Sequence, residues 1–395
     1  MARGHEGRQP ALQRRWAEGA WVLLPGPGEE PPELPDPACL PPGPGVVVGS
    51  GGSTGERRWC LQPLGHLEAS ARATGAWLAQ QGIDPAACLH LNPLPLHHVS
   101  GLLPQLRAAQ WGCEHRPIAA ELMRDPAALV AEVPIPPAGS GLLSLVPTQL
   151  RRLMAASEGV AWLRQLAVIW VGGAALPPEL AAEARREGLR LAPCYGATET
   201  AAMVTALTPQ AFLAGVEGCG RPLGDVELRL DAASGAVELR AARLSPGFLE
   251  QGRMVPLARS ADGWWRSGDG GELSAAGLRI LGRLDGAISS GGETVFPEQL
   301  EARLMVRAQA HTLPLEALLL PEPDPEWGQR LVALVRACPT ACADGLIAAL
   351  QQQVAGWPPA ERPRRWIQCP ELAPTATGKW QRSHWQAWVR SREAG

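Results

Sequence analysis

The sequence predicts an α/β protein of two domains, in which a large α/β domain with an antiparallel β segment precedes a small α+β domain. Three observations support this prediction. The chain has 395 residues, more than one ordinary compact domain holds. Apolar strands alternate with helical stretches in its middle, and the pattern changes after Asp285. We therefore expect a proline-rich segment at 1–45, a large domain at 46–284 and a small domain at 285–395.

The large domain is expected to begin with a buried strand and to continue with alternating strands and helices. Nine prolines predict an extended segment over residues 25–44. Expected helices occupy 67–81, 147–154 and 177–187. Expected strands, in an alternation typical of a parallel sheet, occupy 46–48, 166–171 and 189–192. An antiparallel pair is predicted where apolar and polar side chains alternate, at 226–230 and 236–240.

The small domain is predicted from a mixture of short helices and strands. A helix with proline in its first turn is expected at 297–307, and a second helix at 344–354. Strands are expected at 331–335 and 366–368, before a loop that leads to Lys379. About 110 residues are enough for a small domain of this kind.

Composition excludes several classes of function. A net charge of −3 argues against a surface built to bind nucleic acid. No apolar run approaches the roughly 20 residues of a membrane-spanning helix. The first ten residues are polar and lack the apolar region of a secretion signal, so we expect a cytoplasmic protein. The nine cysteines form no Cys-x-x-Cys pair, and no histidine spacing indicates a zinc site, which favours reduced thiols.

Lysine and tyrosine are almost absent from the chain. Lysine and arginine total 36, yet Lys379 is the only lysine, and Tyr195 is the only tyrosine. A compact ammonium and a planar guanidinium are not interchangeable at a reacting centre. A single lysine retained in such a chain therefore matters if its surroundings indicate a site.

Three motifs of the large domain carry candidate chemistry. Ser50–Gly55 follows a strand, and its small residues let backbone N–H groups approach an anion, although such a loop alone is more often a flexible turn. The segment from His97 to Gly101 predicts a substrate-pocket wall or, as the alternative, a structural histidine pair. The segment from Tyr195 to Glu199 offers a ring for a base, a hydroxyl for a phosphate and a carboxylate for Mg²⁺, or else a simple strand-to-helix turn.

Three further motifs lie at and beyond the expected domain boundary. Asp269 follows Ser267 and Gly268 on a tight turn that suits a ribose diol, and the alternative is an ordinary Asp turn. Glycine-rich stretches at 282–285 and 290–293 indicate a second site or a linker. The loop at 374–379 ends in the only lysine, which is either catalytic or a surface residue.

In order and spacing, these motifs together resemble the adenylate-forming superfamily of acyl- and aryl-CoA ligases, peptide-synthetase adenylation domains and luciferases. The resemblance runs from about Val46 to the C-terminus and includes 146–148, 218–222 and 282–301. It implies a two-domain adenylate-forming fold. It also implies activation of a carboxylic acid by ATP with Mg²⁺, followed by transfer of the acyl group to CoA.

The resemblance implies a role for each motif residue. Lys379, Thr198 and Glu199 would be catalytic, with Glu199 as the Mg²⁺ ligand. Asp285 would be the hinge about which the small domain moves. His97, His98 and Gly101 would line the acyl pocket. Residues that would bind ATP or AMP are Ser50, Gly51, Gly52, Ser53, Thr54, Gly55, Arg58, Gly172, Gly173, Ala174, Tyr195, Gly196, Asp269 and Arg283, with Arg58 in place of the family's loop lysine.

One departure concerns the front of the chain. Only 48 residues precede Gly49, whereas the family carries a longer segment there, so we expect a shortened front subdomain that reduces the outer pocket wall or a dimer surface. Analogy alone allows a homodimer. Within the superfamily the chain is most similar to 2-succinylbenzoate–CoA ligases, which serve menaquinone and phylloquinone synthesis. The alternatives are another aryl- or acyl-CoA ligase, an adenylation domain that loads a carrier protein, or a degenerate nucleotide-binding relative.

Overall fold

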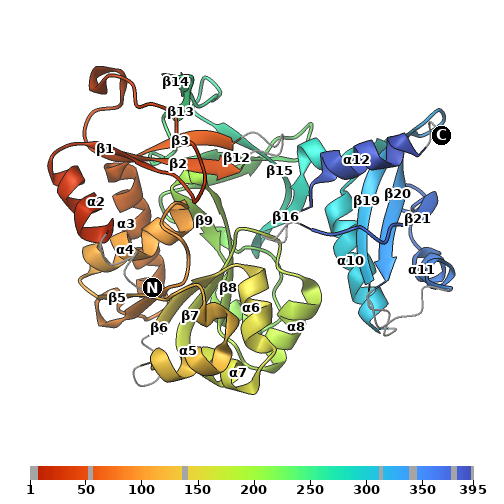
Figure 1. The fold of residues 1–395 in the computed structure, drawn as a ribbon, viewed down its shortest axis with the longest axis horizontal. Helices are drawn as coiled ribbons and strands as arrows, with labels where there is room; N and C mark the ends of the chain where they lie inside the picture. Colours follow the sequence, from red (N-terminus) through yellow and green to blue (C-terminus); the bar gives the residue numbers. More distant parts are fainter. Residues whose placement is uncertain are drawn as a thin grey trace. The chain divides into compact units, whose positions relative to one another are not determined.

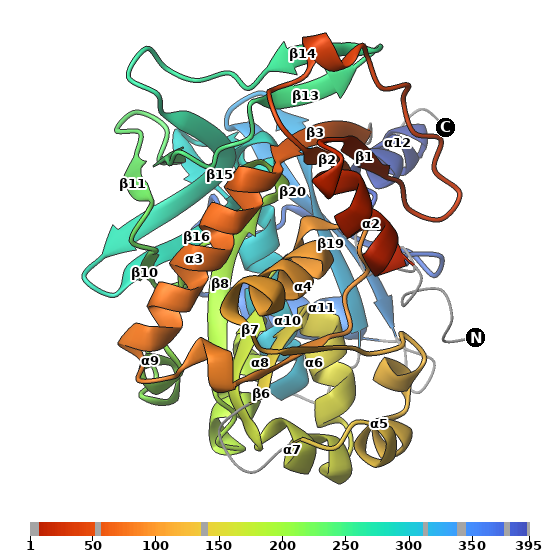
Figure 2. The same cartoon turned by 90° about the vertical axis from the view of Figure 1, so that its left-hand side faces the viewer.

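The computed structural model describes residues 8–51, 57–135, 141–310, 315–337, 345–374 and 380–392, drawn in Figures 1 and 2. The chain divides into two compact units. The first comprises Met1–Leu176, Leu180–Ser267 and Gly271–Ile280, and the second comprises Pro177–Glu179, Gly268–Gly270 and Leu281–Gly395. No helix among the described residues is long and apolar enough to cross a membrane.

A seven-stranded sheet forms the centre of the first unit. Its strands are β4 Leu89–Asn92, β5 Glu114–Pro117, β6 Gly141–Leu145, β7 Leu166–Val171, β8 Leu191–Ala197, β9 Ala202–Ala206 and β10 Arg221–Pro222. They lie in the order β10-β9-β8-β7-β6-β4-β5. The five strands from β5 to β8 are parallel, and β9 and β10 are antiparallel to them. The parallel α/β architecture predicted from the sequence is therefore confirmed.

Helices cover both faces of this sheet, which explains why its middle strand is apolar throughout. All six residues of β7 are buried, as expected for a parallel strand covered on both sides. Four helices pack on one face: α5 Pro126–Glu132, α6 Pro147–Met154, α7 Ser157–Leu163 and α8 Pro178–Arg186. The opposite face carries α3 Leu64–Gln80 and α4 Val99–Trp111, which lie in front of the sheet in Figure 2. A short helix, α9 Pro209–Leu213, follows β9.

Two smaller sheets lie mostly within the first unit, and residues 268–270 of β15 and 281–283 of β16 belong to the second. One has the order β1-β2-β3-β13-β14, with β1 Trp21–Leu24, β2 Gly45–Gly51, β3 Arg57–Pro63, β13 Gly247–Glu250 and β14 Arg253–Pro256. The other has the order β11-β12-β15-β16, with β11 Glu227–Leu230, β12 Ala236–Arg240, β15 Trp265–Ser274 and β16 Gly277–Arg283. The predicted antiparallel pair is confirmed, because β11 and β12 pair with Glu227 opposite Arg240.

The first residues of the chain form two elements that the sequence pattern does not predict. Helix α2 spans Arg8–Ala17, and of its residues 11–17, whose burial is described, Leu12 and Trp16 are buried, too few to produce a visible period. The indole N–H of Trp16 donates to the carbonyl of Gly45 at 3.2 Å. Strand β1 then pairs in parallel with β2. Both elements precede the proline-rich stretch at 25–44, within the segment 1–45 for which no helix or strand was predicted.

The second unit contains a sheet with helices on both faces. Its strands are β17 Ile288–Ser290, β18 Glu293–Val295, β19 Leu315–Asp324, β20 Gly328–Ala337 and β21 Arg365–Gln368, in the order β18-β17-β20-β19 with β21 beside β20. Strict alternation along β19 separates two cores. Leu319 and its neighbours on that face pack on α10 Pro297–Ala310 and α11 Leu346–Val354. Leu318 and Leu320 pack on α12 Arg382–Ser391.

Candidate functional site

The segment that carries Tyr195 and Glu199 is partly strand. It was expected to be a loop after a strand, but β8 continues through Tyr195 and Gly196 to Ala197, and only Thr198–Thr200 forms a 3₁₀ turn. The strand continues because its edge is paired: Tyr195 lies opposite Thr205 on β9. A side chain at Gly196 would stand 2.2 Å from a β9 carbonyl, so only glycine permits this approach.

Three hydrogen bonds fix the backbone of the turn that follows β8. The amide of Gln62 donates to the Thr198 carbonyl at 2.5 Å, and the Ser245 N–H donates to the Glu199 carbonyl at 2.7 Å. The Thr200 hydroxyl accepts the Ala197 N–H at 2.8 Å. Because these hydrogen bonds hold the main chain from both sides, the Cα atoms from which the Thr198 and Glu199 side chains project are fixed.

The phosphate-loop candidate lies between β2 and β3. Gly52, Ser53, Thr54 and Gly55 fall outside the described residues, and so does Lys379. At the mouth of the loop Ser50 pairs with Arg58 across the two strands, and its hydroxyl donates to the Arg58 carbonyl at 3.3 Å. The Arg58 guanidinium stacks 3.4 Å from the centre of the Phe248 ring and reaches Glu250 at 3.4 Å. It is already engaged with β13 at the edge of the loop.

The glycines after β7 lie against the strand that carries Tyr195. A side chain at Gly172 would come within 2.9 Å of the Cys194 sulfur. Gly173 has a φ of +78°, which favours glycine, and Ala174 is exposed beside it. Small residues at 172–174 therefore leave the C-terminal edges of β7 and β8 open, where ligands bind in parallel α/β sheets.

The histidine pair directly precedes helix α4, without a side-chain capping hydrogen bond from His98. The rings of His97 and His98 lie 4.5 Å apart, and His98 is the residue before the first turn. Gly101 is required there, because a side chain would stand 2.2 Å from the Pro95 carbonyl. The amide of Asn92, at the end of β4, donates to the Gly101 carbonyl at 2.8 Å. This contact ties the pair to the same edge of the sheet.

A buried arginine that no motif indicated lies behind this edge. Arg107 on α4 is 4% exposed, and its Nε has no hydrogen-bond partner among the residues that the structure describes. Within the same described set, the indole nitrogen of Trp170 and both ring nitrogens of His90 are also buried without a partner. The guanidinium lies 5.3 Å from the centre of the Trp170 ring. The centres of the His90 and Trp170 rings lie 5.8 Å apart.

Buried polar atoms without hydrogen bonds are unfavourable, because each has lost its hydration without compensation. A ligand that hydrogen-bonds to them would remove this cost. Burial lowers the pKa of Arg107 to about 10, so the guanidinium keeps its charge near neutral pH. Burial also lowers the pKa of His90 well below its usual value, so this ring is neutral. Arg107 interacts electrostatically with Cys194, the residue beside Tyr195. One buried positive charge therefore lies near the predicted acyl site, and among 35 arginines no sequence signal distinguishes it.

The ribose and hinge candidates come together in the second unit. Arg283 ends β16 and lies 3.5 Å from Asp269 and 3.0 Å from Asp285, which sits in the turn Leu284–Gly286. Gly268 makes room for this cluster, because a side chain there would stand 3.0 Å from the Arg283 guanidinium. The three residues that the sequence assigned to ribose binding and to the hinge thus form one charge network.

Magnesium would depend on a single carboxylate and on the nucleotide. The described residues contain no group of three or more His, Cys, Asp or Glu side chains that could hold a metal ion. Mg²⁺ is commonly bound by one or two carboxylates together with substrate phosphates. Glu199 is half-buried, and its charge adds to burial in raising the pKa of the Cys60 thiol. A fixed, partly desolvated carboxylate of this kind fits a magnesium ion that arrives with ATP.

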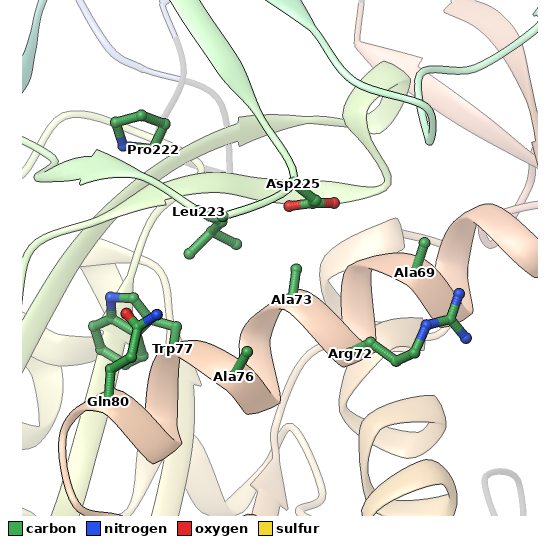
Figure 3. Close-up of a pocket in the computed structure, with 10 residues that line it drawn as sticks. Ala69, Arg72, Ala73, Ala76, Trp77, Gln80, Pro222, Leu223 and Asp225 are labelled. Atoms are coloured by element: carbon green, nitrogen blue, oxygen red, sulfur yellow. The ribbon is translucent and has the colours of Figure 1, made fainter.

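A groove of about 440 Å³ lies elsewhere in the first unit. It runs between α3 and residues 222–225, and Figure 3 shows Asp225 facing Ala73 across it. None of the predicted site residues lines this groove. Helix α3 contributes Ala69, Ala73, Ala76 and Trp77 to its wall, with Arg72 toward one end and Gln80 at the other.

A buried ion pair anchors the helix that follows the lysine loop. Arg382, at the start of α12, donates to Glu301 on α10 at 2.7 Å, and the Leu319 N–H donates to the same carboxylate at 2.7 Å. Burial raises the pKa of Glu301 from 4.5 to about 7, and the charge of Arg382 opposes this shift only in part.

Glu301→Gln is expected to remove a pH dependence of stability. A carboxyl group whose pKa is raised on folding stabilises the folded protein at pH values below its pKa in the unfolded chain. This stabilisation is lost as the pH rises through its pKa in the folded protein. Between pH 5 and 8 the free energy of unfolding of the wild type should therefore fall by on the order of 2–3 kcal/mol, relative to that of the variant. Thermal unfolding across this range tests the prediction, with Glu316→Gln on the outer pair to Arg336 as the control. Parallel curves for wild type and Glu301→Gln would contradict it.

Comparison with known proteins places the chain among nucleotide-dependent enzymes. The family model for AMP-binding enzymes matches residues 22–240. The 2-succinylbenzoate–CoA ligase of Salmonella typhimurium is 35% identical over 252 residues, which cover 64% of this chain and 51% of that protein. The ligase of the same name from Enterococcus faecalis is 28% identical over 352 residues, 84% of this chain and 67% of that protein. The chain thus spans about half the length of the first of these relatives.

Solved structures show the same fold. The Escherichia coli MenE structure with a bound m-phenylether-linked analogue of OSB-AMS has a TM-score of 0.64 and 29% identity, over 88% of this chain and 69% of that one. The Bacillus subtilis o-succinylbenzoate CoA synthetase with the acyl-adenylate OSB-AMP has a TM-score of 0.72 over 86% and 68%, at 22% identity. The family match over more than half of the sequence confirms the resemblance read from its motifs, and the chain belongs to the AMP-binding enzymes.

Proposed function

We propose that the protein is an ATP-dependent acid–thiol ligase that converts 2-succinylbenzoate to 2-succinylbenzoyl-CoA. The observation that carries this proposal is the likeness to relatives named 2-succinylbenzoate–CoA ligase, over 64% and 84% of the chain for the two described above. The MenE structures, with a bound OSB-AMP intermediate or an analogue of OSB-AMS, support the same acid. The product would serve menaquinone or phylloquinone synthesis in the cytoplasm. A homodimer is proposed by analogy only.

The proposed nucleotide site uses the residues at the edges of β2, β7 and β8. The 50–55 loop would hold the ATP phosphates, with Arg58 at its end. Residues 172–174 and Gly196 would leave room for the adenine, on which Tyr195 would stack. In the second unit, Asp269 would accept hydrogen bonds from the ribose hydroxyls, and Arg283 would hold that carboxylate in place. A carboxylate suits a diol because each of its oxygens accepts hydrogen bonds.

The chemical step would depend on charge and position. The carboxylate must attack the α-phosphorus of ATP, forming the acyl–AMP bond as the bond to the β-phosphate breaks and pyrophosphate leaves, so two anions approach each other. Mg²⁺, held by Glu199 and the phosphates, supplies positive charge when bound. Thr198 would donate to the α-phosphate, and the ammonium of Lys379 would neutralise the charge that develops. Positioning and electrostatics therefore carry the step, with little acid–base chemistry. For thioester formation the small domain would turn about Asp285 and remove Lys379 from the reacting atoms.

The pocket for the acid must accommodate a substrate with two carboxylates. One carboxylate reacts, and the other needs a fixed cation in the pocket. Arg107 provides a buried guanidinium whose Nε has no partner among the described residues, close to Cys194 and so to Tyr195. The His97–Gly101 segment begins the same helix and would form the pocket wall. We therefore propose that Arg107 receives the unreacting carboxylate of the substrate.

Thioester formation tests the function directly. The protein is incubated with MgATP, CoA and 2-succinylbenzoate, beside benzoate, coumarate and medium-chain fatty acids, and the products are identified by mass. Rapid 2-succinylbenzoyl-CoA with little else is expected. Thioesters of another acid would keep the reaction and reject the substrate. Adenylate without transfer to CoA would favour an adenylation domain that loads a carrier protein, and no AMP from any acid would reject the proposal.

Arg107→Leu is expected to lower kcat/KM for 2-succinylbenzoate on the order of 10²-fold, because a buried charge-assisted hydrogen bond contributes about 1.5–3 kcal/mol. Benzoate, which has no second carboxylate, should lose little. Arg107→Lys keeps a positive charge and should fall between wild type and Arg107→Leu. Rates for both acids, normalised to folded protein, provide the measurement. An equal loss for the two acids would mean that Arg107 only supports the fold.

A further inference from the structure

A second buried arginine holds the turn that carries Thr198 and Glu199. Arg243 follows β12 and is 1% exposed. Its guanidinium donates to the carbonyls of Thr200, Ala201 and Met203, the last at 3.0 Å. These acceptors all belong to one stretch of main chain, which begins directly after Glu199. The five N–H groups of a guanidinium suit such a set of acceptors, and a lysine ammonium cannot reproduce their spacing.

The stretch held by Arg243 has an unfavourable backbone. Ala201 has a φ of +52° and Ala202 a φ of +75°, conformations that residues with a side chain rarely adopt. Such conformations persist only where the surroundings determine them, and they gather at functional sites. Here the determining contact is the guanidinium of Arg243, because it binds the carbonyls before, within and after the left-handed pair.

Arg243 is itself clamped at its other side. Its Nε donates to Asp225 at 2.6 Å, and a second nitrogen reaches the same carboxylate at 3.4 Å. Asp225 also lines the groove beside α3 (Figure 3). Its side chain is 33% exposed and binds Arg243. The main chain around Arg243 is fixed as well, because Arg259 donates to the carbonyls of Leu244 and Ser245 at 3.0 and 2.8 Å.

We propose that Arg243, clamped by Asp225, is a positioning residue that sets the Thr198–Glu199 turn for adenylate formation. This inference rests on the proposed function. Arg243 contacts no atom that reacts; it acts through the carbonyls of residues 200–203 on the two side chains just before them. Its removal should displace the magnesium ligand and the phosphate contact, and leave the stacking surface of Tyr195 on β8 in place.

The test separates nucleotide binding from the chemical step. Because Tyr195 is the only tyrosine, full-length protein labelled with 3-fluorotyrosine has one ¹⁹F resonance, which should shift on binding MgATP. For Arg243→Lys we expect this shift in full, a fall in kcat for pyrophosphate release on the order of 10²-fold, and a several-fold rise in half-saturating Mg²⁺. The matched control is Arg240→Lys, three residues earlier, whose exposed pair with Glu227 lies outside the turn. Arg240→Lys should keep the ¹⁹F shift, the kcat for pyrophosphate release and the half-saturating Mg²⁺ concentration within about twofold of the wild type.

Asp225→Asn provides a second variant in case Arg243→Lys does not fold. It leaves the buried guanidinium in place and removes only the charge of its clamp, so we expect a fall in kcat of about tenfold, in line with the loss of one charge-assisted hydrogen bond. Wild-type kcat and Mg²⁺ dependence in folded Arg243→Lys would overturn the inference. A loss of activity that merely follows a loss of the ¹⁹F shift would overturn it too, because it would show a structural role alone. If the ¹⁹F resonance of the wild type does not shift with MgATP and the wild type releases no pyrophosphate, the proposed function fails instead.

Discussion

Replacing Lys379 by alanine is expected to block most adenylate formation and to spare the transfer of preformed acyl-adenylate to CoA. The ammonium is proposed to meet charge that develops at the α-phosphate only in the first step. Removing a preorganised donor of this type costs on the order of 10²–10³ in rate. Pyrophosphate release measures the first step, and thioester formation from synthetic 2-succinylbenzoyl-adenylate measures the second. Equal losses in both would contradict this division of the two steps.

Lys379→Arg is the informative companion to this variant. Arginine provides 35 of the 36 lysine and arginine side chains of this chain, so Lys379→Arg asks whether the one exception needs an ammonium. The guanidinium keeps the charge, but it is broad, planar and already delocalised. We expect Lys379→Arg to recover at most a tenth of the wild-type rate of pyrophosphate release. Full activity would show that position 379 requires only a positive charge.

Glu199→Gln is expected to slow adenylate formation on the order of 10²–10³-fold and to raise the Mg²⁺ concentration needed for half of the maximal rate. The substitution keeps the shape of the side chain and leaves the carbonyl of residue 199 bonded to the Ser245 N–H. The folded structure should therefore persist while the only proposed protein ligand loses its charge. Pyrophosphate release at a series of Mg²⁺ concentrations provides the measurement.

The control for this variant removes a carboxylate of the same unit that has no proposed role. Glu187 forms an exposed ion pair with Arg164 at 2.6 Å, and such pairs contribute about 0–1 kcal/mol to stability. Glu187→Gln should thus leave the rate and the Mg²⁺ dependence unchanged. If Glu199→Gln keeps the wild-type Mg²⁺ dependence despite a lower rate, Glu199 is not the ligand.

Local patterns in the sequence were sufficient for the parallel sheet and for the list of candidate residues. Strand β7 is apolar at every position because both of its faces are covered, and helix α6 begins and ends where its proline and apolar spacing predict. The order and spacing of the motifs are those of the adenylate-forming superfamily, and the family match over residues 22–240 agrees with them. Helix α2 was not predicted because, over its residues 11–17, only Leu12 and Trp16 are buried.

The sequence by itself therefore determined the fold class, the family and the candidate residues of the proposed nucleotide site, because these depend on local periodicity and on short motifs. Only the tertiary structure decided which arginines matter. Arg107 and Arg243 are chemically identical to the other arginines of the chain, and neither lies in a motif. They differ in being buried against carbonyls, indole rings and unpaired polar atoms that come from distant segments. A contact between residues some 40 or 60 positions apart leaves no local pattern, because it arises only when the chain has folded.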